Sequence, residues 1–293
     1  SPNQVIRFLD LKLGNVCNLK CRICSVSSSS KWGKEQADLY GKTPELAAQL
    51  EAGQWPRTQQ AWWKDLETVL EDITYFEFTG GEPFLIQEQF DVLQKAVDLG
   101  IAGNISIHYN TNGTILPVQY KVWKHFKRVN IAVSIDDIHE RFEYQRKGAN
   151  WKQVKENIRE MNYMLPNEGI DVSLQVCTTI NVQNIYYFDP LYEMLKNLGI
   201  KDLYLNLLQE PWYFNIRNMP QYAKLHILDR YKHHDIKGDV WHGHFHKLLQ
   251  FMMLPGRTDT IPELQRVLAQ SDAYRRESFS QVHPEIAKLL KVS

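Results

Sequence analysis

Short apolar segments and amphipathic segments alternate along most of the chain. The short segments are rich in β-branched residues and are bounded by turn residues, a pattern typical of β-strands. We predict strands at 6–13, 73–78, 105–109, 131–135, 172–176 and 203–207. Apolar residues recur at helical spacing between them, which predicts helices at 60–72, 87–99, 117–126, 151–164 and 190–198.

Repeated strand–helix units favour an α/β fold in which parallel strands are joined by right-handed crossovers. Six units within residues 1–208 are the number expected for a partial (β/α)6 barrel. An insertion at 25–56 interrupts them. Residues 209–293 form a C-terminal extension, which we expect to be mostly helical or irregular and to cover the barrel mouth or edge. Sites in such folds lie at the carboxyl ends of the strands, so polar residues there are the first candidates.

Composition narrows the functional classes. The chain has 293 residues, 43% of them apolar, and 34 basic and 34 acidic residues. Balanced charge gives no clear signal for nucleic-acid or membrane-surface binding. No apolar run is long enough for a transmembrane helix, and no signal peptide is recognisable at the N-terminus. Because the chain begins with Ser1 rather than Met, a trimmed tag and an earlier natural start both stay open.

Three of the four cysteines lie close together after the first predicted strand. Cys17, Cys21 and Cys24 have the spacing C-x3-C-x2-C. Three thiolates can bind three irons of an iron–sulfur cubane and leave the fourth iron open to a substrate. A structural zinc site needs four ligands, and a disulfide would leave one thiol over. The spacing therefore predicts a [4Fe–4S] cluster, in a chain that we expect in the reducing cytoplasm.

C-x3-C-x2-C after a first strand resembles the defining motif of the radical S-adenosylmethionine (SAM) superfamily. Residues 13–22 around it are similar to members that carry SPASM or twitch extensions. One departure is Ile23, where the family usually has an aromatic residue whose backbone packs near the adenine of SAM. The resemblance covers about residues 5–208. It implies two cofactors, the [4Fe–4S] cluster and SAM, with the three cysteines as the catalytic, metal-binding residues.

Two further motifs resemble SAM-binding elements of this family. Gly80, Gly81 and Glu82 end the second predicted strand and resemble the GGEP element that receives the SAM amino group. Glycines let the backbone approach a ligand, and a carboxylate accepts hydrogen bonds from an ammonium. Asn110 and Asn112 end the third strand and resemble strand-end polar residues near SAM. Taken alone, the first motif is a common strand-to-helix turn, and the second is a turn with an Asx hydrogen bond.

The later strand ends carry the remaining candidates. Ser134 and Asp136 share one face of an extended segment and resemble an element that binds the ribose hydroxyls of SAM. Asp137 follows them where relatives usually have Gly. Arg146 resembles the arginine that pairs with the SAM carboxylate, a role that suits a planar guanidinium; an ordinary surface arginine is the alternative. Asn181, after the fifth strand, resembles a further residue on the SAM side.

The resemblance implies an oxidoreductase or transferase that cleaves SAM reductively. An external low-potential electron donor of the flavodoxin or ferredoxin type would reduce the cluster, and a 5′-deoxyadenosyl radical would abstract hydrogen from a substrate. The SPASM-like motif favours a peptide or protein substrate. A small metabolite or nucleotide stays open, and so does a non-catalytic relative that only binds a cluster. The intact cysteine set, together with Glu82 and Arg146, argues against the last of these.

Three features outside these motifs are weighed separately. Cys177 is the only cysteine after Cys24, so a cysteine-ligated auxiliary cluster needs ligands from an earlier part of a longer protein. A small buried hydrophobe is the favoured role for Cys177, with a hydrogen-donor or auxiliary role as the alternative. Trp212–Phe214 belongs either to the core or to the substrate mouth. A solvated polar loop is favoured over a metal site for His233, His234, His242, His244 and His246.

Overall fold

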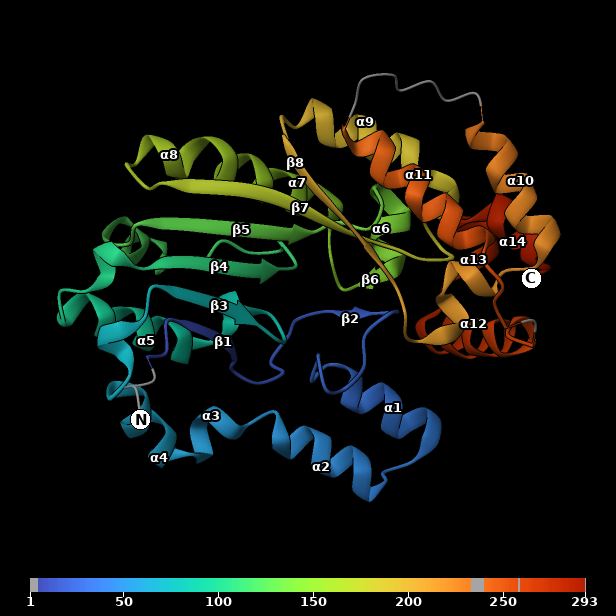
Figure 1. Cartoon of the computed structure of the whole chain (residues 1–293). Coiled ribbons are helices and arrows are strands. Elements are labelled where there is room, and N and C mark those ends of the chain that lie inside the picture. The colour runs from blue at the N-terminus through green and yellow to red at the C-terminus, as the bar shows by residue number, and fades with distance from the viewer. Residues whose placement is uncertain (1–4, 233–239, 258, 293) are drawn as a thin grey trace. The chain divides into compact units, whose positions relative to one another are not determined.

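The computed structural model describes residues 5–232, 240–257 and 259–292. The fold is α/β, and its main sheet has six strands in the order β1-β3-β4-β5-β7-β8 (Figure 1). The chain divides into two compact units, each of which is described by itself. Unit 1 consists of residues 1–134 and 147–175, and unit 2 consists of residues 135–146 and 176–293.

Parallel pairing of the first four strands sets the position of the strand ends. The strands of the main sheet are β1 (Phe8–Lys12), β3 (Tyr75–Thr79), β4 (Ser106–Thr111), β5 (Arg128–Ser134), β7 (Val172–Ile180) and β8 (Asp202–Leu207). From β1 to β5 the register is parallel, with Leu11 opposite Phe78 and Phe78 opposite Tyr109. Their carboxyl ends therefore meet at one edge of unit 1. Two short strands, β2 (Lys20–Cys21) and β6 (Arg146–Lys147), lie outside this sheet.

An aromatic stack fills the core of unit 1. The helices of unit 1 are α1 (Trp32–Tyr40), α2 (Pro44–Ala52), α3 (Trp55–Thr58), α4 (Gln60–Glu67), α5 (Gln87–Asp98), α7 (Trp151–Arg159) and α8 (Leu165–Asn167). The rings of Phe78 and Tyr109 stack with centroids 5.3 Å apart, and both side chains are buried. The Trp123 indole N–H donates to the Tyr109 hydroxyl at 3.2 Å. This packing holds β3 and β4 in register and so fixes where they end.

The six predicted strands and the α/β fold class are confirmed. The helix predicted at 117–126 is instead a short 3₁₀ helix, Tyr120–His125. Within it, the i,i+3 residues Tyr120 and Trp123 lie on one side, with ring centroids 6.4 Å apart. The helix predicted at 151–164 continues beyond α7 as a π-helical turn, Glu160–Met164. The insertion at 25–56 contains α1, α2 and the start of α3.

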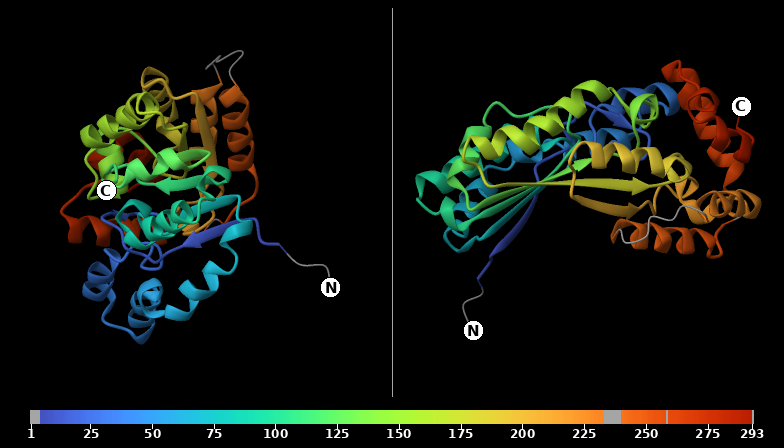
Figure 2. Two further views of the ribbon diagram at one scale, coloured as in Figure 1. Left: turned by 90° about the vertical axis from the view of Figure 1, so that its left-hand side faces the viewer. Right: turned by 90° about the horizontal axis from the view of Figure 1, so that it is seen from above.

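Helices of the C-terminal extension complete the core of unit 2. The helices of this unit are α6 (His139–Gln145), α9 (Phe188–Asn197), α10 (Gln221–Tyr231), α11 (Val240–Met253), α12 (Ile261–Arg275), α13 (Phe279–Val282) and α14 (Pro284–Leu290). The two views of Figure 2 show α10 and α11 side by side. The Tyr144 hydroxyl of α6 donates to Asp272 of α12 at 2.7 Å, and the Tyr187 hydroxyl donates to Glu285 of α14 at 2.7 Å.

No helix within the described ranges 5–232, 240–257 and 259–292 is both long enough and apolar enough to cross a membrane.

Truncation of the chain after Leu208 is expected to prevent unit 2 from folding. The truncated chain keeps every strand of the main sheet but loses buried side chains such as Phe214, Leu268 and Phe279, each at most 1% exposed. Their partners would then face water. We expect loss of soluble protein, measured by yield and near-UV circular dichroism. A chain that ends at Lys291 and keeps α14 is the matched control. A soluble truncated chain with a native-like spectrum would contradict this account.

Candidate cluster and cofactor site

The three motif cysteines lie on one compact loop after β1. Cys17 and Cys21 are buried, Cys24 is exposed, and none of the three forms a disulfide. The Leu19 N–H donates to the Cys17 Sγ at 3.4 Å, and the Cys24 N–H donates to the Cys21 carbonyl at 3.0 Å. Leu19 itself is fully buried and packs against Cys17 and Cys21. The loop thus brings the three thiols together within eight residues, with none of them in a disulfide.

The three cysteine side chains of this loop are suitable ligands for a cubane iron–sulfur cluster. Burial raises the pKa of the Cys17 thiol, while the Leu19 N–H opposes this shift. The Asn112 side-chain amide also lies 3.9 Å from the Cys17 Sγ and can donate to it. Among the described residues, no three His, Cys, Asp or Glu side chains converge on a single ion. A cubane does not require such convergence, because each thiolate binds a different iron.

Two glycines bring the end of β3 against the cysteine loop. Gly80 and Gly81 have φ of 77° and 51°, which side chains rarely adopt. A Cβ on Gly81 would lie 2.2 Å from the Val16 carbonyl oxygen, so only glycine permits this approach. The next residue continues the contact, because the Glu82 N–H donates to the same Val16 carbonyl at 2.7 Å.

The Glu82 carboxylate joins the ends of β3 and β4. It is fully buried and accepts hydrogen bonds from the Phe84 N–H at 3.1 Å, the Thr111 hydroxyl at 2.7 Å and the Asn112 N–H at 2.7 Å. Three donors compensate for the hydration that this carboxylate loses on burial. Glu82 therefore fixes the strand-end backbone directly beside the cysteine loop. The roles of Thr111 and of the Asn112 main chain were not predicted from the sequence.

The two predicted asparagines at the carboxyl end of β4, Asn110 within the strand and Asn112 just after it, have different surroundings. The Asn112 side chain donates to the Asn18 side-chain oxygen at 2.9 Å, inside the cysteine motif. The Asn18 side chain in turn donates to the Thr114 hydroxyl at 2.8 Å. The Asn110 side chain instead donates to Glu77 of β3 at 3.3 Å. Asn112 thus joins the cysteine loop to the end of β4. Asn18, which was not singled out from the sequence, completes this link.

In unit 2, two predicted SAM contacts are paired with each other. The Arg146 guanidinium contacts the Asp136 Oδ2 through Nη2 at 2.7 Å and through Nε at 2.9 Å, and both side chains are buried. The Asp136 Oδ1 accepts the Thr179 N–H at 2.9 Å. Arg146 is therefore not an ordinary surface arginine. Ser134, predicted with Asp136, is the last residue of β5 and is half-buried.

Asn181 shapes the loop that follows β7. Its side chain donates to the Thr179 carbonyl at 3.0 Å and accepts the Gln183 N–H at 2.9 Å. The Asn184 side chain donates to the main-chain carbonyls of Asp136 and Thr179, each at 2.9 Å. Asn184 thus connects the loop to the Asp136 segment, a role that the sequence did not indicate. Asn181 is buried, so its side-chain bonds are made within the fold.

Asp137, where relatives were expected to have Gly, begins a short ion-paired turn. Its carboxylate accepts the Ile138 N–H at 2.8 Å and both oxygens lie 3.0 Å from the Arg141 Nε. Burial raises the pKa of Asp137 to about 7, against the opposing effect of Arg141. The carboxylate thus ties the residue before α6 to Arg141 within that helix.

The other positions considered from the sequence, Ile23, Cys177 and Trp212–Phe214, differ in burial. Ile23 is half-buried. Burial raises the pKa of the half-buried Cys177 thiol to about 11, so this thiol is protonated at neutral pH. In the aromatic segment, Phe214 is buried, and the Arg257 guanidinium lies 4.1 Å from the centre of the Trp212 ring. The segment contributes at least one ring to the core.

The prediction of a polar loop around the histidines is partly wrong. Residues 240–253 form α11, so His244 and His246 lie on a helix and their side chains do not share one extended face. Both are exposed. His233 and His234 lie outside the described residues, as does the side chain of His242.

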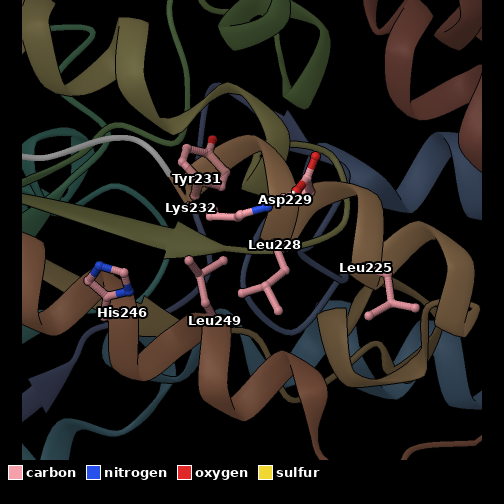
Figure 3. Close-up of a pocket in the computed structure, with 7 residues that line it drawn as sticks. All are labelled: Leu225, Leu228, Asp229, Tyr231, Lys232, His246 and Leu249. Carbon is pink, nitrogen blue, oxygen red and sulfur yellow. Dashed lines mark hydrogen bonds and ion pairs between the residues drawn. The ribbon is translucent and has the colours of Figure 1, made fainter.

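Two cavities in the described structure are separate from the predicted site residues. One, of about 360 Å³, lies between α10 and α11 (Figure 3). Its lining residues are Leu225, Leu228, Asp229, Tyr231, Lys232, His246 and Leu249. The other, of about 420 Å³, lies between α1 and α2 of unit 1. Neither cavity is lined by any residue that the sequence assigned to the cluster or to SAM.

Comparison with known proteins identifies the family of this chain. A family model described as the radical SAM superfamily matches residues 11–198. The solved structure of hexahistidine-tagged anSMEcpe with bound AdoMet is 17% identical, with a TM-score of 0.52, and the match covers 78% of this chain and 60% of that one. Streptococcus suis SuiB bound to its precursor peptide SuiA is 12% identical, with a TM-score of 0.47 and coverages of 78% and 45%.

The chain thus spans about three fifths of the length of anSMEcpe. At 17% identity the anSMEcpe structure is informative about the fold alone. The family model, in contrast, matches more than half of the chain and includes the cysteine loop, the Gly-Gly-Glu turn and the Arg146–Asp136 pair. This chain belongs to the radical SAM superfamily, whose enzymes use a [4Fe–4S] cluster and S-adenosylmethionine.

Proposed function

We propose that Cys17, Cys21 and Cys24 each bind one iron of a [4Fe–4S] cluster, and that the enzyme cleaves SAM to abstract hydrogen from a peptide or protein. One observation carries the cluster site: three cysteines lie on a single loop, none of them in a disulfide, and Glu82 and Asn112 tie this loop to the strand ends. A cluster held by free thiols needs a reducing compartment, and we therefore propose the cytoplasm.

In unit 1, the strand-end backbone and Glu82 would receive the SAM amino group. The close approach of Gly80 and Gly81 to the cysteine loop leaves main-chain carbonyls, rather than side chains, at this edge. Carbonyl and carboxylate oxygens are the acceptors that an ammonium requires. We assign Asn110 and Asn112 to the same side. Asn112 would orient the loop as well, since its amide also lies near the Cys17 sulfur.

In unit 2, Arg146 would bind the SAM carboxylate and Asp136 the ribose hydroxyls, with Asn181 as a further contact. Ser134 and the Ile23 backbone, which belong to unit 1, are also proposed SAM contacts. A guanidinium carries five N–H donors in a planar fork, so one arginine can hold two carboxylates at once. The Asp136 contact would keep the fork in a fixed orientation before SAM arrives. Orientation of this kind lowers the entropic cost of binding.

The bound cluster, once reduced by an external low-potential donor, supplies the electron that breaks the sulfonium C–S bond of SAM. Residues of this chain would hold and orient SAM and exclude water from it. The resemblance of residues 13–22 to SPASM and twitch members favours a peptide or protein as that substrate. We further propose that residues 1–208 carry the common chemistry, and that 209–293 and the 25–56 insertion select the substrate.

Alanine at each motif cysteine tests the cluster site. We expect about four irons per chain after anaerobic reconstitution of the wild type, and loss of the cluster in Cys17→Ala, Cys21→Ala and Cys24→Ala. Cys177→Ala is the matched control and should keep all the iron, since its protonated thiol is a poor ligand. Iron and sulfide analysis provides the measurement. Full iron loading of the triple alanine variant would exclude this assignment.

Arg146→Lys tests the cofactor contact. Lysine keeps the charge but loses the fork, so we expect SAM affinity to fall by about 1.5–3 kcal/mol, the range for hydrogen bonds to charged groups. Anaerobic calorimetry with the reconstituted protein measures this. Arg128→Lys is the control, because Arg128 is half-exposed with its Nε 4.0 Å from Asp171. Equal SAM affinity in Arg146→Lys and wild type would remove Arg146 from the cofactor site.

Fractionated cell extract tests the substrate class. We expect extract from the organism that makes this protein to accelerate 5′-deoxyadenosine formation, with the activity in the macromolecular and peptide fraction. Protease treatment of that fraction should abolish the effect, because the hydrogen donor would be destroyed. Activation by the protease-resistant small-molecule fraction instead would show that the substrate is a metabolite or nucleotide.

A further inference from the structure

The insertion that follows Cys24 is bonded directly to the cysteine loop. The Ser29 hydroxyl donates to the Leu19 carbonyl at 2.5 Å, and the Trp32 indole N–H donates to the Cys21 carbonyl at 3.1 Å. Trp32 begins α1, which continues from the loop within unit 1 (Figure 1). The Cys21 carbonyl therefore accepts both the Cys24 N–H and the Trp32 indole.

A buried ion pair reinforces this connection. The Lys20 Nζ lies 2.6 Å from the Glu35 Oε2, and the Glu35 side chain is fully buried. Lys20 stands between Cys17 and Cys21, next to the second thiol, while Glu35 lies in the first turn of α1. A buried carboxylate is costly without a cationic partner, so the pair holds the loop and the helix together. The geometry of the cysteine loop thus depends on α1.

We infer that Glu35 and Lys20 are positioning residues for the cluster: the pair fixes the cysteine loop and balances the charge beside it. This inference rests on the proposed cluster site. Cluster potential depends on net charge and on hydrogen bonds near the sulfurs. A lysine charge without its carboxylate partner favours the more negative, reduced cluster, whereas loss of the lysine charge disfavours it. Trp32 supports the pair by holding the Cys21 main chain.

The two partners should therefore have opposite effects on the reduction potential. In Glu35→Gln the midpoint potential is expected to become less negative, and in Lys20→Gln more negative. The double variant, which restores charge balance, should return close to the wild-type value. Redox titration followed by electron paramagnetic resonance provides the measurement. Purely structural damage would move both single variants in the same direction, so opposite shifts identify the charge effect.

Iron release gives a second readout. Loss of a group that holds a metal ligand in place typically costs tenfold or more in metal affinity, so we expect a chelator to remove iron about tenfold faster from Glu35→Gln than from wild type. Asp38→Asn is the matched control, since the exposed Asp38 pairs with Lys34 at 2.6 Å on the same helix. If Glu35→Gln does not fold, Trp32→Phe removes the indole hydrogen bond to Cys21 while keeping an aromatic ring, and it should also speed iron release.

Wild-type potential and release rate in Glu35→Gln, Lys20→Gln and Trp32→Phe would overturn this inference. If those variants and the wild type still hold about four irons, the proposed function would be unaffected. Failure of the wild type itself to hold a cluster would overturn both.

Discussion

The buried carboxylate of Glu82 is the contact on which the candidate site in unit 1 depends. The Glu82 main-chain N–H holds Val16 beside the first cysteine, and the carboxylate oxygens hold Thr111 and Asn112 at the end of β4. A fully buried carboxylate must keep such donors, because loss of one leaves an uncompensated charge. Three chain segments are therefore fixed at one point. The glycines before Glu82 are required for the same reason, since any side chain there would push the cysteine loop away.

Two buried ion pairs hold other residues of the candidate site in fixed orientations. Lys20 with Glu35 fixes the cysteine loop in unit 1, and Arg146 with Asp136 fixes the proposed cofactor arginine in unit 2. In each pair, the basic residue, Lys20 or Arg146, lies next to the proposed chemistry, and the carboxylate of its partner holds that residue in place. Such pairs add little net stability, because desolvation of two charges offsets their attraction. Their contribution is orientation, which the proposed radical chemistry would require.

Much of the fold was predictable because short β-branched segments and amphipathic segments differ clearly in period. The cysteine motif and the Gly-Gly-Glu turn were also readable, because their spacing is local. The partners of Glu82 were not, since Thr111 and Asn112 are 29 and 30 residues away and meet it only through parallel pairing of β3 and β4. Nor was the contact of Lys20 with Glu35, which depends on how α1 folds back onto the loop.

Reductive cleavage of SAM by the reconstituted protein tests the central claim most directly. Anaerobic protein with dithionite and SAM should form 5′-deoxyadenosine, detected by chromatography and mass spectrometry. The product should also form with Cys177→Ala and should be absent with Cys17→Ala, Cys21→Ala or Cys24→Ala. A wild-type protein that carries a full cluster and binds SAM but forms no 5′-deoxyadenosine would contradict the account. Equal product from the triple cysteine variant would contradict it as well.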